Sequence, residues 1–176
     1  MRITNKMIIT SFTIICLIIF LYGYTWIETS FRSRRFLEEA KNSYSQGDFI
    51  KAIKGGDVVI DGNYVFVGGL QQVCTAWESP LAWPKPDVYN TALNLLDKII
   101  DKEMTIDIGM QLFKNYFQLD RKYLDRILLR VGDLYYEHGE YQQAKDIYKN
   151  AQEIFVHNKN LQTYTSKRLE EMNTLK

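Results

Sequence analysis

Proline, cysteine and histidine are all scarce in this sequence of 176 residues, which contains 3, 2 and 2 of them. All the prolines lie between Pro80 and Pro86, so the rest of the chain is free to form long helices. Cys16 lies in an apolar N-terminal run, and Cys74 is the one thiol outside it, which excludes a disulfide within the remainder. The net charge of +1 gives no reason to expect a nucleic-acid partner.

Residues of catalytic or metal-binding type are also few and poorly placed. Neither His138 nor His157 has a cysteine or carboxylate at a spacing typical of a metal site or a catalytic triad. The glycine-containing stretch GGDVVIDGN lacks the lysine–serine ending of a phosphate-binding loop. The sequence therefore predicts no enzyme activity, no catalytic residue, no metal site and no cofactor.

One long apolar segment lies near the N-terminus, where residues 7–27 include no charged side chain. As a helix this uncharged run would rise about 31 Å, which matches one hydrocarbon core. Tyr22, Tyr24 and Trp26 stand at its far end, where amphipathic rings favour the membrane interface. A cleaved signal peptide is the alternative, but the run is long for one and no small-x-small cleavage site follows. We expect residues 1–29 to form a tail and a single-pass anchor in contact with membrane lipid.

The orientation of this anchor depends on basic residues near its ends. The far side has more of them than the near side, namely Arg32, Arg34, Arg35 and Lys41 against Arg2 and Lys6. This distribution favours a cytoplasmic location for the rest of the chain. A short basic tail before an apolar run also begins many chains whose soluble domain is exported, so the exported side stays open.

Residues 30–176 are expected to form one helical domain, so the fold class is all-α. Helical periodicity predicts helices over residues 87–103, 105–117, 121–138, 140–156 and 160–172. An earlier helix should stop at Gly47, and Asp48 should cap the next one. The stretch VVIDGNYVFV has an Asp-Gly turn signal typical of a β-hairpin, but a lone hairpin is marginal, so we favour helix, turn, helix there.

The clearest loop is WESPLAWPKPD, residues 77–87, which holds every proline of the chain and two tryptophans. Asp87 is a candidate cap for the helix that follows. Trp77 and Trp83 are candidate partner-binding residues, because tryptophan is enriched at interaction hot spots. The alternative is that one or both of these tryptophans fold back onto the helices as core.

Small and large side chains alternate between residues 124 and 157. The pattern comprises Leu128, Val131, Gly132, Tyr135, Gly139, Tyr141, Ala144, Tyr148 and Ala151. Gly132 and Ala144 would let two antiparallel helices approach closely, with tyrosines filling the space beside them. This pattern resembles the tetratricopeptide repeat, with departures at Leu128 and Val156, where the family often has tryptophan and proline. A plain helical bundle would use similar residues and remains the alternative.

Weaker copies of the pattern precede this repeat. One copy falls at Ala40, Gly47, Phe49, Ala52 and Val59, and the second helix of another at Tyr89, Ala92, Leu96 and Ile99. The resemblance therefore implies an irregular array of about three helical pairs with a capping helix, residues 160–172.

Members of this family bind protein segments in a groove lined by the first helix of each pair. The resemblance places Arg126, Leu129, Asp133 and Tyr136 in that groove, and Leu129 and Asp133 do not supply the lysine–asparagine clamp of the chaperone-tail binders. The expected function is a membrane-tethered protein–protein interaction module, an adaptor or assembly factor with a membrane-associated protein partner. The alternative is a permanent accessory subunit of a large membrane protein complex.

Overall fold

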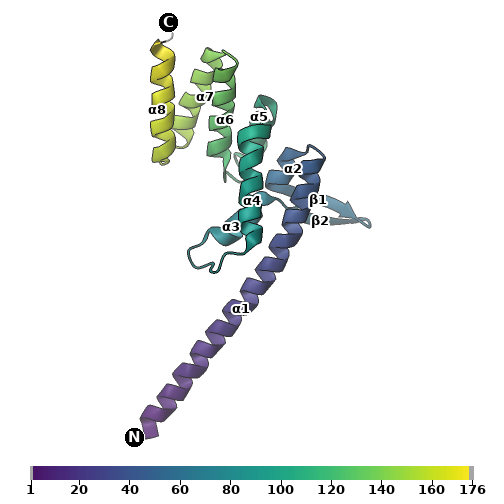
Figure 1. Cartoon of the computed structure of the whole chain (residues 1–176), viewed down its shortest axis with the longest axis vertical. Helices are drawn as coiled ribbons and strands as arrows, with labels where there is room; N and C mark the ends of the chain where they lie inside the picture. Colours follow the sequence, from purple (N-terminus) through teal and green to yellow (C-terminus); the bar gives the residue numbers. More distant parts are fainter. Residues whose placement is uncertain (1, 175–176) are drawn as a thin grey trace.

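The structure is a computed structural model that describes residues 2–174, which are mostly helical (Figure 1). Its elements in order are α1 (Arg2–Ser45), α2 (Phe49–Lys54), β1 (Gly55–Ile60), β2 (Asn63–Gly68), α3 (Leu70–Glu78), α4 (Asp87–Lys98), the short π-helix η1 (Ile99–Glu103), α5 (Ile106–Tyr116), α6 (Leu124–Glu137), α7 (Tyr141–Ile154) and α8 (Lys159–Thr174). The helices after residue 87 lie within a few residues of the predicted ranges.

The first helix, α1, is 44 residues long and projects far from the rest of the chain (Figure 1). It includes the uncharged run, whose large apolar side chains are exposed, and it is long and apolar enough to cross a membrane. From Ser30 onward one face is buried, at Ser33, Leu37 and Ala40 among others. The helix passes without interruption through the expected boundary between residues 29 and 30, so the uncharged run and the start of the helical domain belong to one helix.

The turn after α1 follows the chemistry of its residues. Gly47 has φ +77°, a left-handed conformation that glycine adopts without a steric cost. The Asp48 side chain accepts a hydrogen bond from the backbone N–H of Lys51 at 3.0 Å and so caps α2. Both predictions for this turn are confirmed, and α2 packs back against α1.

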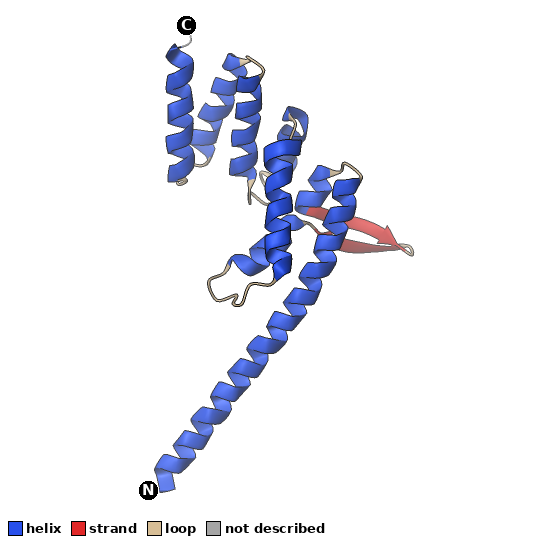
Figure 2. Ribbon diagram, viewed as in Figure 1, coloured by secondary structure: helices blue, strands red, loops and turns tan. Residues whose placement is uncertain are grey.

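The stretch VVIDGNYVFV is a β-hairpin, so the prediction of helix, turn, helix there was wrong. Strands β1 and β2 pair antiparallel from Gly55↔Gly68 to Ile60↔Asn63. Asp61 and Gly62 both have positive φ, +50° and +79°, which gives the two-residue turn that matches strand twist. The hairpin extends outward from α1 (Figure 2). Val59, expected to continue a helical repeat, lies in β1, so that weaker copy ends with α2.

Close packing at the base of the hairpin stabilises it although it has only two strands. A Cβ on Gly68 would lie 2.3 Å from the Phe36 ring of α1, and one on Gly69 would lie 2.4 Å from the Gly55 nitrogen. Glycine at these positions lets the hairpin backbone pack directly against α1 and the end of α2. Tertiary packing therefore supplies the support that an isolated hairpin lacks.

The proline loop is shorter than predicted and comprises residues 79–86. Trp77 belongs to α3, and α4 begins at Asp87 with Pro86 as its N-cap. The prediction that Asp87 caps the helix was wrong, because the extended conformation of Pro86 places Asp87 in the first turn instead. There its carboxylate lies at the positive end of the helix dipole.

The buried side chains form one large cluster and two smaller ones. The large cluster joins α1 through α6 and centres on side chains such as Ile53, Leu70, Trp77, Leu96 and Leu124. The smaller clusters hold α6, α7 and α8 side by side (Figure 1). The molecule is thus a helical body with a three-helix end remote from the N-terminal part of α1.

Candidate interaction surfaces

The packing of α6 against α7 follows the small-and-large pattern of the sequence. A Cβ placed on Gly132 would lie 2.5 Å from Cε1 of Tyr148, so the backbone of α6 rests on that ring. Ala144, Tyr148 and Ala151 of α7 are fully buried. Gly139 turns the chain between the two helices with φ +77°. The expectation of a close approach at Gly132 is confirmed.

The four residues expected to line a groove lie on α6, and their contacts differ. Leu129 packs into both small apolar clusters. Asp133 accepts hydrogen bonds from the hydroxyls of Tyr148 and Tyr164, at 2.6 and 2.7 Å. Tyr136 meets Tyr141 edge to face. Arg126 forms an ion pair with Asp97 at 2.7 Å and, unlike the other three, lines a cleft described below.

Of the two tryptophans in the predicted loop, one is buried and the other is exposed. Trp77 is 2% exposed, donates from Nε1 to the Ser33 hydroxyl at 2.9 Å, and meets Trp26 edge to face. Trp77 is therefore a core residue between α1 and α3, as the alternative interpretation of the tryptophans had it, and not a surface contact. Trp83 is 76% exposed and remains available to a partner or to lipid.

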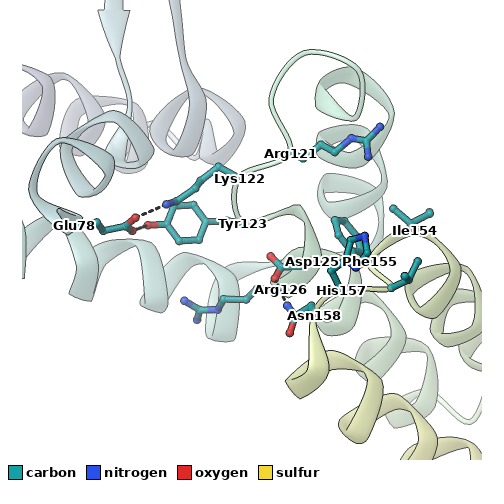
Figure 3. A pocket seen from close by; sticks show the side chains of 11 residues that line it. Glu78, Arg121, Lys122, Tyr123, Asp125, Arg126, Ile154, Phe155, His157 and Asn158 are labelled. Atoms are coloured by element: carbon teal, nitrogen blue, oxygen red, sulfur yellow. Dashed lines mark hydrogen bonds and ion pairs between the residues drawn. The ribbon is translucent and has the colours of Figure 1, made fainter. Parts of the chain in front are cut away.

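A cleft of about 670 Å³ opens between three segments of the helical body (Figure 3). They are the end of α3, the segment from the α5–α6 connection into α6, and the α7–α8 connection. The lining residues are Glu78, Arg121, Lys122, Tyr123, Asp125, Arg126, Ile154, Phe155, Val156, His157 and Asn158. Because they come from distant parts of the chain and follow no helical period, sequence patterning gave no signal for this cleft.

One wall of the cleft is a polar trio. Glu78 forms an ion pair with Lys122 and accepts a hydrogen bond from the Tyr123 hydroxyl at 2.6 Å (Figure 3). Burial alone would raise the pKa of Glu78, but these two donors outweigh it and lower the pKa below its usual value. Burial, followed by the hydrogen bond to the carboxylate, raises the pKa of Tyr123. The Glu78 carboxylate in this wall is therefore held in position by Lys122 and Tyr123.

Lys54, at the end of α2, donates hydrogen bonds to the backbone next to this wall. It is 3% exposed, and its Nζ donates to the backbone carbonyls of Asp120 and Lys122, each at 3.0 Å. Burial lowers the pKa of Lys54, and the nearby Asp120 carboxylate opposes that effect. A buried cation needs such partners, so the connection that carries Arg121 and Lys122 is tied firmly to the core.

The opposite wall is apolar and cationic. Val156 is 56% exposed, Phe155 and Ile154 are half-buried, and His157 is exposed beside them. Asn158 donates to Asp125 at 2.8 Å, which fixes the α7–α8 connection against α6. The Arg121 guanidinium lies 4.2 Å from the Phe117 ring centroid and forms no ion pair with any residue that the structure describes. This wall offers apolar surface and an available positive charge.

Within residues 2–174, no group of three or more histidine, cysteine or acidic side chains is placed to hold a metal ion. The cleft contains no cysteine or serine nucleophile. The side chains that line it offer apolar contact and charge.

Comparison with family models, with curated proteins and with solved structures finds no match for this chain.

Proposed function

We propose that this protein is a membrane-tethered protein–protein interaction module, an adaptor or assembly factor for a complex at the membrane. In this proposal the uncharged run crosses the bilayer and α2–α8 form the recognition domain. The observation that carries it is the cleft of about 670 Å³, built on a helical body at the end of a helix apolar enough to span a membrane.

We also propose that α6 and α7 form a tetratricopeptide-like pair and that α8 caps it. The close approach of Gly132 to Tyr148 and the buried Ala144 and Ala151 support this assignment. Stacked helix pairs of this kind present binding surfaces for extended protein segments. On this chain the surface lies at the ends of the helices, in the cleft, because α6 residues such as Asp133 are used for internal contacts.

The lining of the cleft defines the chemistry of the segment it would bind. Val156 and Phe155 suit an apolar side chain, since burying apolar area is the main favourable term in association. Arg121 suits a carboxylate, because a guanidinium pairs with it through two parallel hydrogen bonds. The expected ligand is a protein segment with an acidic residue close to an apolar one.

Photo-crosslinking of the full-length chain in native membranes tests this function. With a benzophenone side chain at Val156, inside the cleft, we expect an adduct of discrete mass with a second protein. The same probe at Tyr141, exposed at the opposite end of α7, is the matched control and should give none. In the probe-bearing chain, Arg121→Glu should abolish the adduct, whereas Lys149→Glu, exposed on α7 outside the cleft, should keep it.

Equal yields at the two probe positions would contradict a binding cleft. Gentle detergent extraction followed by size analysis then distinguishes the two forms of the function. An adaptor should be released largely free of its partner, whereas a permanent accessory subunit should remain in one large complex.

A further inference from the structure

The proline loop, residues 79–86, is held against α1 at the end of the uncharged run. The Tyr22 hydroxyl lies 2.8 Å from the carbonyl oxygen of Leu81 and 2.6 Å from that of Trp83, and it accepts a hydrogen bond from the Trp83 N–H. Trp26 donates from Nε1 to the carbonyl of Pro84 at 2.8 Å. Side chains of the apolar helix thus fix the position of a loop some 60 residues later in the chain.

The backbone N–H groups between residues 80 and 84 of this loop all have partners. From residue 80 to residue 84, the two prolines have no N–H, and each of the other three N–H groups has a partner. Leu81 donates to the Ser79 hydroxyl, Ala82 to the Ser79 carbonyl, and Trp83 to the Tyr22 hydroxyl. Because every N–H of this stretch is paired, no backbone donor would be left unsatisfied at a lipid boundary, which lowers the cost of removing the stretch from water.

Two large apolar side chains of the same loop, Leu81 and Trp83, are exposed, whereas Ala82 packs against the core. Leu81 is 82% exposed and Trp83 is 76% exposed, an arrangement that is unfavourable in water for two large apolar groups. They stand beside Tyr22 and Trp26, which lie about 2 to 8 Å before the end of the uncharged run along the helix axis. Tyrosine and tryptophan at this level favour the membrane interface.

We propose that the proline loop is a second membrane contact, in which Leu81 and Trp83 enter the interfacial layer of the same bilayer that the uncharged run crosses. The inference rests on the proposed crossing. It adds that the helical domain touches the membrane surface with a defined face, the one formed by the loop between α3 and α4.

Basic side chains flank this contact at the level of lipid headgroups. On α1, Arg32 and Arg35 are exposed about 8 and 12 Å beyond the end of the uncharged run. In the loop, Lys85 is exposed and lies over the Tyr89 ring, with 4.6 Å from Nζ to the centroid. An apolar tip bordered by cations fits a bilayer with anionic headgroups.

Fluorescence quenching in vesicles tests the contact with the full-length chain. A polarity-sensitive dye is attached to single cysteines introduced as Phe12→Cys, Leu81→Cys or Glu140→Cys in a Cys16→Ser background. Cys74 can stay, because it is fully buried and burial raises the pKa of its thiol to about 11. The vesicles contain phosphatidylcholine, phosphatidylglycerol and a lipid with a nitroxide near the headgroup.

The three positions separate this inference from the crossing on which it rests. Phe12 lies within the uncharged run, and Glu140 lies in the turn between α6 and α7, at the end of the body remote from α1 (Figure 1). We expect the nitroxide lipid to quench the dye at position 81 and to leave the dye at position 140 unquenched. A lipid with its nitroxide deep in the acyl chain should quench the dye at position 12.

Quenching at position 12 with none at position 81 would overturn the second contact and leave the anchor intact. A second variant, Trp83→Cys, guards against a local effect of the first, and the proposal requires quenching at both loop positions. If position 12 is unquenched by the deep nitroxide, the membrane crossing itself is wrong.

Discussion

Gly132 and Tyr148 define the tightest approach between α6 and α7. Because a Cβ at residue 132 would already lie 2.5 Å from the Tyr148 ring, a larger side chain must displace that ring or separate the helices. Gly132→Leu should therefore lower the free energy of unfolding by roughly 1–3 kcal/mol or more, as overpacked cores do. Denaturant unfolding of the full chain in detergent measures it.

Gly56→Leu is the matched control, because no atom lies within 4 Å of a Cβ placed there. An unchanged midpoint for Gly132→Leu would mean that α6 and α7 do not meet at this glycine.

The hydroxyl of Tyr148 should make the free energy of unfolding depend on pH in the alkaline range. Burial first, and then the hydrogen bond to Asp133, raise the pKa of Tyr148 above its usual value. Above about pH 10 the tyrosine ionises in the unfolded chain, whereas Tyr148 in the folded chain keeps its proton because its pKa is raised. The folded chain then binds more protons than the unfolded chain, so the folded state loses stability as the pH rises. Unfolding free energy should fall by up to about 1.4 kcal/mol per pH unit from this group.

Comparison of the native chain with Tyr148→Phe isolates that dependence. The variant should show a shallower loss of stability between about pH 10 and pH 11, because the titrating group is gone while Tyr123 and Tyr164 remain. Tyr141→Phe, at an exposed site, serves as control. Parallel curves for the native chain and Tyr148→Phe would show that this hydroxyl ionises equally in both states.

At the scale of elements, Asp133 joins three helices. Its carboxylate on α6 accepts from Tyr148 of α7 and Tyr164 of α8, and Arg168 of α8 lies 3.7 Å away. Asp133→Ala would leave the buried hydroxyl of Tyr148 and the partly buried hydroxyl of Tyr164 without this acceptor, at a cost of about 1–3 kcal/mol for a buried group left unsatisfied.

Because α8 has few large apolar residues of its own, it should be the element that loosens. Hydrogen exchange of the α8 amides should accelerate in Asp133→Ala, while α4 stays protected. Asp146→Ala removes an exposed carboxylate that accepts a hydrogen bond from Gln142 of the same helix, so exchange in α8 should be unaffected. Equal protection of α8 in both variants would argue that apolar contacts alone hold it.

Sequence reasoning predicted the helices of this chain well, because their signals are local. Gly47, Asp48 and Gly139 mark helix ends through backbone conformation and capping, and the structure places them there. The hairpin was missed because the general instability of two-stranded sheets was weighed above the Asp61–Gly62 turn signal. The hairpin is stabilised by the packing of Gly68 against the Phe36 ring. This is a tertiary contact, and no periodic pattern in the sequence indicates it.

The candidate sites were less predictable than the elements. Asp133 was expected in a groove, yet two tyrosines at sequence separations of 15 and 31 residues reach its carboxylate. Trp77 was a candidate for either a partner contact or the core, and it is a core residue whose indole N–H donates a hydrogen bond to the Ser33 hydroxyl on α1. Such pairings depend on how helices cross, and the chain alone does not encode them in a readable pattern.

At the scale of the whole molecule, the end of the uncharged run also supports the domain. Trp26 packs edge to face on buried Trp77, and Tyr22 holds the proline loop. A chain that begins at Leu21 keeps these contacts, whereas one that begins at Ser30 loses them, although both lack the long apolar segment. The shorter chain should unfold at a lower denaturant concentration, since the aromatic pair alone contributes about 0.5–1.5 kcal/mol beyond its burial.

Both chains should be extracted without detergent, because neither retains a membrane-length apolar run. Identical unfolding midpoints would indicate that Tyr22 and Trp26 serve only the bilayer. Membrane association of the chain that begins at Ser30 would show that a further surface or a partner holds it there.

The unbroken α1 has a mechanical consequence. A domain on a flexible tether samples many orientations. If the uncharged run crosses a bilayer as proposed, the domain instead takes the tilt of the crossing helix, because α1 continues into it. Bilayer thickness sets the tilt of a crossing helix through hydrophobic mismatch. With no hinge between Ile27 and Ser45, a thicker or thinner membrane would swing the cleft toward or away from the lipid plane. The local lipid composition, through the thickness of the bilayer, would thus determine which neighbouring proteins the cleft can contact.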